Sequence, residues 1–263
     1  MAQPSADSAQ TVFLPTIDST NAEALRRARC GERGPLWVVA REQTAGRGRR
    51  GRPWVSPAGN LHATLLVTDP APPAAAPQLG FVAGLALHDA ATAAAPALNL
   101  RLKWPNDLLC GGAKIAGILI EGEGAPLAAA IGIGVNCRAY PADADYPATD
   151  FAAEGATVTS EALFAGLAAA MERRLAQWNR GAGFAAIRAA WLDRADGVGG
   201  PIRVRLADRA AHGEFVTIDD AGRLMLRHDG RSGGDALEAI AAGEVFPLRL
   251  PLPHRTPAVP VED

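Results

Sequence analysis

Arginine and glycine alternate in one segment of the sequence, and this segment could bind an anion. Residues 46–52 read GRGRRGR, and the apolar runs at 36–40 and 61–67 lie on either side. Glycine brings backbone N–H groups close to a ligand, and arginine supplies permanently charged, planar donors. A solvated charge run would explain the arginines and glycines equally well. Gln43 and Trp54 nearby add polar and stacking groups, and they favour a site in a loop between two strands.

The apolar segment at 127–136, LAAAIGIGVN, carries a second candidate surface. In a central strand its isoleucines point to one face, while Gly132 and Gly134 point to the other. Glycine weakens a strand unless something approaches the backbone there. A packed helix and a bound ligand are equally good explanations for the glycines. Asn136, at the end of the same strand, favours the ligand.

A helix N-terminus is the third candidate. Asp18-Ser19-Thr20-Asn21 precedes a helix predicted to run to about Cys30, and Gly31 would end it. Thr20 and Glu23 have the spacing of a capping box, so the simpler interpretation is that Ser19 and Thr20 only cap the helix. A ligand is compatible with it, because the first N–H groups of a helix are free to bind a polar group.

Composition limits the classes of protein. The chain has 263 residues, 48% of them apolar and 21% charged, and a net charge of −2. This length fits one large domain or one large and one small domain. The near-neutral charge makes the arginine cluster a local feature and argues against a nucleic-acid-binding protein. Three cysteines without metal spacing indicate reduced thiols, and neither a membrane-spanning run nor a signal peptide is found, so we expect a cytoplasmic protein without membrane contacts.

The remaining pattern predicts alternating strands and helices, followed by a change of character after residues 196–201. His62 is expected to be a half-exposed strand histidine. The predicted elements are a strand at 12–14, a buried helix at 79–95, a strand at 101–104, a hairpin at 108–121 turning at Gly111-Gly112, an irregular loop at 140–155, and amphipathic helices at 160–178, capped by Ser160, and at 184–194. Short strands at 202–206, 213–218 and 224–227, ending near 244–250, imply a small β-barrel.

These patterns divide the chain into a domain at 12–197, a small domain at 198–250, and disordered tails at 1–11 and 251–263.

Taken together, the motifs resemble the biotin–protein ligase family from about Asp18 to Leu250. Each motif is weak alone, but the ordered set is specific. The motifs are Asp18-Ser19-Thr20-Asn21; GRGRRGR at 46–52 with Gln43 before it and Trp54 after it; Lys103-Trp104-Pro105-Asn106-Asp107; and KIAGILIE at 114–121. The resemblance implies an α+β fold, with a central mixed β-sheet flanked by helices as in class II synthetases and biotin–lipoate ligases, followed by a small SH3-like β-barrel.

The resemblance also implies a two-step reaction. Biotin and ATP form biotinoyl-5′-AMP, and the biotinyl group then passes to a lysine of a biotin carboxyl carrier protein domain. The catalytic residues implied are Lys114 and Arg49. The biotin site would consist of Ser19, Thr20, Asn21, Gln43, Arg47, Gly48, Arg49 and Lys114; the ATP site of Arg49, Arg50, Arg52, Trp54, Lys103, Asn106 and Asn136; and Asp107 would bind Mg²⁺. A purely structural turn at 105–107 remains an alternative.

Two other classes of function remain open. A lipoate ligase or an octanoyl transferase would share the fold, but Gln43 and the arginines suit a ureido ring better than a fatty chain. A nucleic-acid binder would need interleaved aromatic residues and a basic surface. Only seventeen residues precede Asp18, too few for the DNA-binding domain of the family's repressors, so we expect a ligase that does not bind DNA. The sequence leaves open whether the chain is a monomer or a homodimer.

Overall fold

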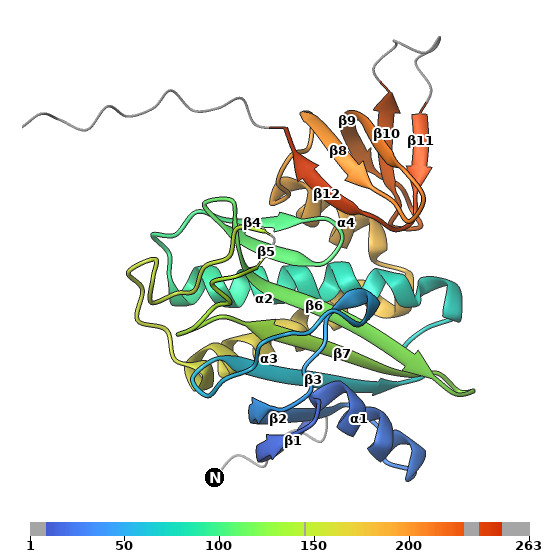
Figure 1. Ribbon diagram of the computed structural model, residues 1–263. Coiled ribbons are helices and arrows are strands. Elements are labelled where there is room, and N and C mark those ends of the chain that lie inside the picture. Colours follow the sequence, from blue (N-terminus) through green and yellow to red (C-terminus); the bar gives the residue numbers. More distant parts are fainter. Residues whose placement is uncertain (1–8, 145, 229–236, 249–263) are drawn as a thin grey trace, which may run out of the picture.

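Two β-sheets organise the protein. The computed structural model describes residues 9–144, 146–228 and 237–248. A seven-stranded sheet with its helices forms the larger part, and a five-stranded sheet formed by the C-terminal strands lies beside β4, β5 and α4 (Figure 1). Among the described residues, no helix is long and apolar enough to cross a membrane.

The large sheet is mixed, as the resemblance implies. Its order is β1-β2-β3-β7-β6-β5-β4, with β1 parallel to β2 and the other pairs antiparallel. The hairpin of β5 and β6 turns through Gly111 and Gly112, which both have positive φ, the geometry that a two-residue turn requires. The strands are β1 (Gln10–Ile17), β2 (Leu36–Gln43), β3 (Leu61–Thr68), β4 (Leu100–Lys103), β5 (Asp107–Cys110), β6 (Ala113–Glu123) and β7 (Ala128–Val135).

Helices cover the two faces of this sheet unequally. Alternation along β2 sends Leu36 and Val38 toward α1, and Trp37 and Val39 toward the core with α2 and α3. The helix α1 has only ten residues, so it leaves part of the sheet face on which it packs uncovered by helix. The candidate site lies there. The helices are α1 (Thr20–Arg29), α2 (Leu79–Ala94), α3 (Ser160–Trp178) and α4 (Phe184–Asp193), with 3₁₀ turns at Arg49–Gly51, Pro73–Gln78 and Asn179–Gly181.

The C-terminal strands form the expected small antiparallel domain. Their order is β11-β10-β9-β8-β12, and the core of this sheet is continuous with that of the large domain. Trp104 Nε1 donates to Gly222 O at 3.2 Å and so ties the two parts together. The strands are β8 (Pro201–Arg205), β9 (Ala210–Ile218), β10 (Leu224–His228), β11 (Leu237–Ile240) and β12 (Glu244–Pro247).

Several local predictions were wrong. Of Ser19 and Thr20, both expected to cap α1, only Ser19 does: its Oγ accepts from Ala22 N at 3.4 Å, whereas the Thr20 hydroxyl is bonded to Gln43. The cap of α3 is Thr159, one residue before the predicted Ser160. His62 is only 1% exposed, because β3 lies inside the sheet between β2 and β7.

The ends of the chain differ from the prediction in one respect. Strand β1 begins at Gln10, within the segment 1–11 that was expected to be disordered, because its backbone pairs with β2 from Leu36 onward. Residues 1–8 of that tail, the tail at 251–263 and the last residues of the predicted small domain lie outside the described residues.

The packing of the small domain can be tested at Gly222. This glycine has a φ of +81°, and a Cβ there would lie 2.7 Å from the Phe81 ring. We expect Gly222→Ala to lower the free energy of unfolding by about 1–3 kcal/mol more than a control with the same backbone strain. The control is Gly155→Ala, where φ is +77° and nothing lies within 4 Å of the added Cβ. Urea unfolding measures both, and equal losses would contradict the packing.

Candidate active site

A small polar cavity opens on the uncovered face of the large sheet. Its volume is about 40 Å³. The start of α1, the end of β2, the arginine–glycine loop and strands β3, β6 and β7 all contribute to its wall. The lining residues are Ser19, Thr20, Asn21, Gln43, Arg47, Trp54, His62, Leu119, Gly132, Ile133 and Gly134.

Buried hydrogen bonds hold the polar side chains of this cavity in place. Gln43 Oε1 accepts from Thr20 N at 2.8 Å and from Thr20 Oγ1 at 3.0 Å. Thr64 Oγ1 lies 2.8 Å from Thr20 Oγ1 and donates to Asn21 Oδ1 at 2.7 Å, and Asn21 Nδ2 donates to Glu121 Oε2 at 2.8 Å. The predicted residues from the helix start and from β2 are therefore brought together. Because the network fixes their rotamers, donors and acceptors stand in place before a ligand arrives.

The two glycines of β7 have different explanations: helix α1 packs on Gly132, as one of the two alternatives expected, whereas a loop side chain lies on Gly134. A Cβ on Gly132 would collide with the side chain of Asn21. A Cβ on Gly134 would lie 2.5 Å from Trp54 Nε1. The side chains of two other candidate residues thus lie directly on the bare backbone of β7.

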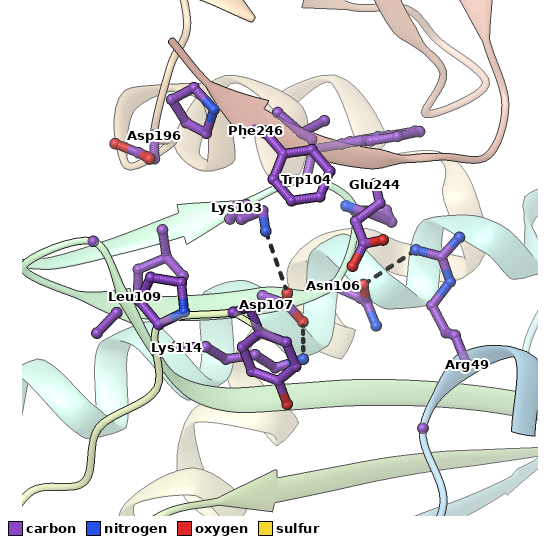
Figure 2. Close-up of a pocket in the computed structure, with 18 of the residues that line it drawn as sticks. Arg49, Lys103, Trp104, Asn106, Asp107, Leu109, Lys114, Asp196, Glu244 and Phe246 are labelled. Atoms are coloured by element: carbon purple, nitrogen blue, oxygen red, sulfur yellow. Dashed lines mark hydrogen bonds and ion pairs between the residues drawn. The ribbon is translucent and has the colours of Figure 1, made fainter. Parts of the chain in front are cut away.

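A larger, charged cavity adjoins the small one. It has a volume of about 560 Å³ and lies between β4–β6, the arginine–glycine loop and β12 of the small domain (Figure 2). Trp54 lines both cavities and forms their common wall. The lining includes four cationic side chains, Arg49, Arg52, Lys103 and Lys114, and three carboxylates, Asp107, Asp196 and Glu244.

Asp107 holds two lysines at the centre of this cavity (Figure 2). Its Oδ1 lies 2.7 Å from Lys114 Nζ and its Oδ2 lies 3.9 Å from Lys103 Nζ. The Oδ1 contact lacks hydrogen-bond geometry, so it is ionic. Burial lowers the pKa of Lys103, and the nearby Asp107 opposes this effect. These two are the only lysines of the chain, and both line the same cavity.

Lys114 lies where the two cavities meet. Its Nζ is 5.4 Å from the centre of the Trp54 ring and 5.3 Å from that of Tyr146, so the cation lies between two aromatic faces. A Cβ on Gly117 would lie 3.3 Å from Lys114 Nζ and 3.5 Å from the Trp54 ring. The absent side chain at Gly117 therefore leaves room for both groups.

The arginines of the loop lie in different places. Arg49 Nη1 donates to Asn106 Oδ1 at 3.3 Å and to Gly243 O at 3.2 Å, so it bridges the loop to both domains, and burial lowers its pKa. Arg52 forms an ion pair with Glu244 at 3.1 Å. Arg47 pairs with Glu121 at 3.2 Å beside the small cavity. Arg50 is exposed and lines neither cavity.

Asn136 is buried and lines neither cavity. Its N–H donates to Ile115 O at 2.9 Å, and its Nδ2 donates to Thr149 O at 3.0 Å. Thr149 N in turn donates to Lys114 O at 3.0 Å. In this structure Asn136 therefore fixes the segment that carries Lys114, and its contact with adenine stays a prediction.

Several lining residues were not singled out from the sequence. They are His62, Tyr146, Glu244 and Phe246, and Glu121 supports the wall from behind through Asn21 and Arg47 without lining it. Glu121 ends a recognised motif and could have been found there. Tyr146, Glu244 and Phe246 come from an irregular loop and from β12, where nothing in the local pattern marks a site.

Comparisons with known proteins agree with this arrangement. Residues 13–137 match the model of the biotin/lipoate A/B protein ligase family, and residues 198–246 match that of the biotin protein ligase C-terminal domain. A biotin--[acetyl-CoA-carboxylase] ligase from Paracoccus denitrificans is 46% identical over 89% of this chain and 99% of its own length.

Solved structures have the same fold. The biotin protein ligase from Aquifex aeolicus, in complex with biotin and ATP, aligns with a TM-score of 0.75 at 23% identity over 92% of this chain and 99% of its own. The enzyme from Leishmania major, in complex with biotinyl-5-AMP, aligns with a TM-score of 0.61 at 28% identity over 89% and 99%. The protein therefore belongs to the class in which a catalytic domain of the biotin/lipoate ligase type is followed by the C-terminal domain of biotin protein ligases. The chain belongs to the biotin protein ligase family.

The role of Asn136 can be tested by Asn136→Asp. Asp cannot donate to Thr149 O, so we expect the free energy of unfolding to fall by about 1–3 kcal/mol. ATP affinity per folded protein should stay near that of the wild type. Asn99→Asp, at an exposed asparagine, is the control. Calorimetric titration with ATP and urea unfolding distinguish the roles, because weakened ATP binding with unchanged stability would place Asn136 at the nucleotide instead.

Proposed function

We propose that the two joined cavities are where this biotin protein ligase condenses biotin with ATP to biotinoyl-5′-AMP and then transfers the biotinyl group to a lysine of a biotin carboxyl carrier protein domain. One observation carries this proposal. A small polar cavity and a large cationic cavity share the wall formed by Trp54, and Lys114 lies at their border. The site thus suits a ligand with a polar head that must meet a polyphosphate.

Biotin would place its ureido ring against Ser19, Thr20, Asn21 and Gln43. The small cavity, at about 40 Å³, holds roughly three waters. Biotin therefore enters only when Trp54 moves with its loop. The network around Thr20 and Asn21 favours a ureido ring over a fatty chain, because a fatty chain would leave its polar groups without partners. This supports biotin over lipoate or octanoate as the substrate.

In the first step a carboxylate oxygen of biotin attacks the α-phosphorus of ATP, and pyrophosphate leaves. The two reactants are anions that repel each other, so the site must neutralise charge and align them. Lys114 and Arg49, with Arg47 and Gly48 in the same loop, would serve the carboxylate and the α-phosphate. Arg52, Lys103 and Asn106 line the large cavity and would hold the remaining phosphates.

In the second step the amine of the acceptor lysine attacks the acyl carbonyl, and AMP leaves. The mixed anhydride formed in the first step is already activated, so no nucleophilic side chain of the protein is required. The protein must instead exclude water until the carrier domain arrives. The contacts of Arg49 and Arg52 with the small domain keep the loop over the cavity and would provide this protection.

Mg²⁺ would accompany the triphosphate, where it offsets phosphate charge. Among the described residues, no three His, Cys, Asp or Glu side chains are grouped to hold a metal ion. This suits Mg²⁺, which takes one or two carboxylates and completes its shell with phosphates and water. Asp107 is the carboxylate at the centre of the cavity, and its present partners are the two lysines. We place the reaction in the cytoplasm, where ATP is available and thiols such as the three free cysteines remain reduced.

Lys114→Ala tests the first step. Because a preorganised charge at the reacting anions is lost, we expect adenylate formation to slow by about a hundredfold or more. The measurement is pyrophosphate release with biotin and MgATP, with circular dichroism to verify the fold. Arg180→Ala, a cation outside both cavities, is the control. If folded Lys114→Ala releases pyrophosphate at the wild-type rate, Lys114 does not act in adenylate formation.

Arg49→Gly tests the loop as a lid. Loss of the bonds to Asn106 and Gly243 should free the loop, so that biotinoyl-AMP escapes and acylates bystander lysines. Biotin incorporated into albumin should rise several-fold over the wild type. Arg180→Gly makes the same substitution at a remote arginine with positive φ and should show no rise. If Arg49→Gly matches that control, the loop does not retain the intermediate.

A further inference from the structure

Two buried side-chain nitrogen atoms on the wall of the small cavity lack hydrogen-bond partners. They are His62 Nδ1 and Trp54 Nε1. In the part of the chain that the structure describes, the only other buried side-chain nitrogen or oxygen without such a partner is Asp107 Oδ1, and it has Lys114 Nζ at 2.7 Å. Because buried polar groups are almost always paired, an orphaned atom on a cavity wall requires an explanation.

The chemistry of His62 fixes what its free nitrogen can do. Its Nε2 lies 3.2 Å from Pro57 O. A carbonyl oxygen only accepts, so Nε2 carries the hydrogen. Burial lowers the pKa of His62 below its ordinary value, with the contact to Pro57 opposing this effect, so the ring is neutral at pH 7. Its Nδ1 is therefore an acceptor, and it requires a ligand that donates.

The position of His62 is set by the sheet. His62 lies directly opposite Gly134 in the β3–β7 register, on the face where the missing Cβ leaves space. The Trp54 indole now fills that space, and no hydrogen bond from its Nε1 holds it there. The indole can therefore withdraw without breaking a hydrogen bond at that atom, and withdrawal uncovers the bare backbone beside the His62 ring.

We propose that His62 Nδ1 accepts a hydrogen bond from a ureido N–H of biotin once Trp54 has withdrawn from Gly134, and that His62 thereby determines specificity for the ureido ring. This inference rests on the proposed function. The ureido nitrogens are the only N–H donors of biotin at neutral pH. A fatty or dithiolane acyl ligand has no N–H and would leave Nδ1 unpaired. The adenine amino group is another N–H donor, but His62 lines the small cavity with Thr20 and Gln43 and not the large cationic one.

Two substitutions separate this role from a structural one. Both His62→Phe and His62→Asn lose the bond to Pro57 O, but only Asn offers an acceptor, Oδ1, near the place of Nδ1. We expect His62→Phe to weaken biotin binding by about 10- to 100-fold, the effect of leaving one buried donor unpaired. His62→Asn should stay within a few-fold of the wild type, and ATP affinity should change in neither.

A matched control is available at His88 in α2. Its Nε2 likewise lies 3.2 Å from a backbone carbonyl, that of Leu100, and burial lowers its pKa too. Its Nδ1 is already paired with Thr92 Oγ1 at 3.4 Å. His88→Phe should therefore leave biotin affinity per folded protein unchanged.

The experiment is isothermal titration of the full chain with biotin and with analogues methylated on one or the other ureido nitrogen. Thermal unfolding of each variant gives its folded fraction. The wild type should discriminate against one methyl isomer, and His62→Phe should lose that discrimination. Two results would overturn the role of His62 and leave the proposed function standing. One is a biotin affinity of His62→Phe equal to that of the wild type, and the other is an equal loss of affinity in His62→Phe and His62→Asn. A wild-type chain that does not bind biotin would overturn the proposed function and this inference with it.

Discussion

The site depends on the bare backbone of β7 at Gly132 and Gly134. Any side chain there would displace Asn21 or Trp54, which come from α1 and from the segment after the arginine–glycine loop. Strand β7 thus positions both the start of α1, through Asn21, and the segment after the arginine–glycine loop, through Trp54. Because α1 has only ten residues, it leaves this part of the sheet uncovered, and the loop covers it instead.

In the large cavity, the arrangement of the side chains depends on charge. Asp107 lies between Lys103 and Lys114 and offsets the mutual repulsion of two cations held close together. Backbone bonds from Thr149 and Pro147 hold the Lys114 segment, and the side chain of Asn136 holds Thr149. If Lys114 acts on anionic substrates as proposed, it is positioned before they bind, so little reorganisation is required at the reacting atoms.

Local sequence predicted the elements of the fold better than their environments. The hairpin at Gly111-Gly112, the buried helix α2 and the change to short strands after residue 200 follow from turn chemistry and periodicity, and all are present. The cap of α3 was off by one residue, and Thr20 does not share the cap of α1, because its hydroxyl bonds elsewhere in the fold. The burial of His62 depends on which strands lie beside β3, and this is a tertiary property.

The same limit applies to the site. The ordered motifs indicated Lys114, Asp107, Arg49 and Gln43, and the structure gathers these residues around two adjoining cavities. Tyr146 and Glu244 complete the wall from segments without a motif. They reach the site only because the irregular loop pairs with the Lys114 backbone and because β12 faces the arginine–glycine loop.

The choice of cations also fits the chemistry of a reactive acyl-adenylate. The chain carries 26 lysines and arginines together, yet only two are lysines, and both lie in the cavity. An acyl-adenylate acylates amines, whereas a guanidinium stays protonated and is a poor nucleophile. Arginine on the rest of the chain therefore supplies charge without adding lysine amines that an escaped intermediate could modify. Inside the cavity, Lys114 Nζ lies 2.7 Å from Asp107 Oδ1, so this amine is already engaged in an ion pair with a carboxylate of the protein.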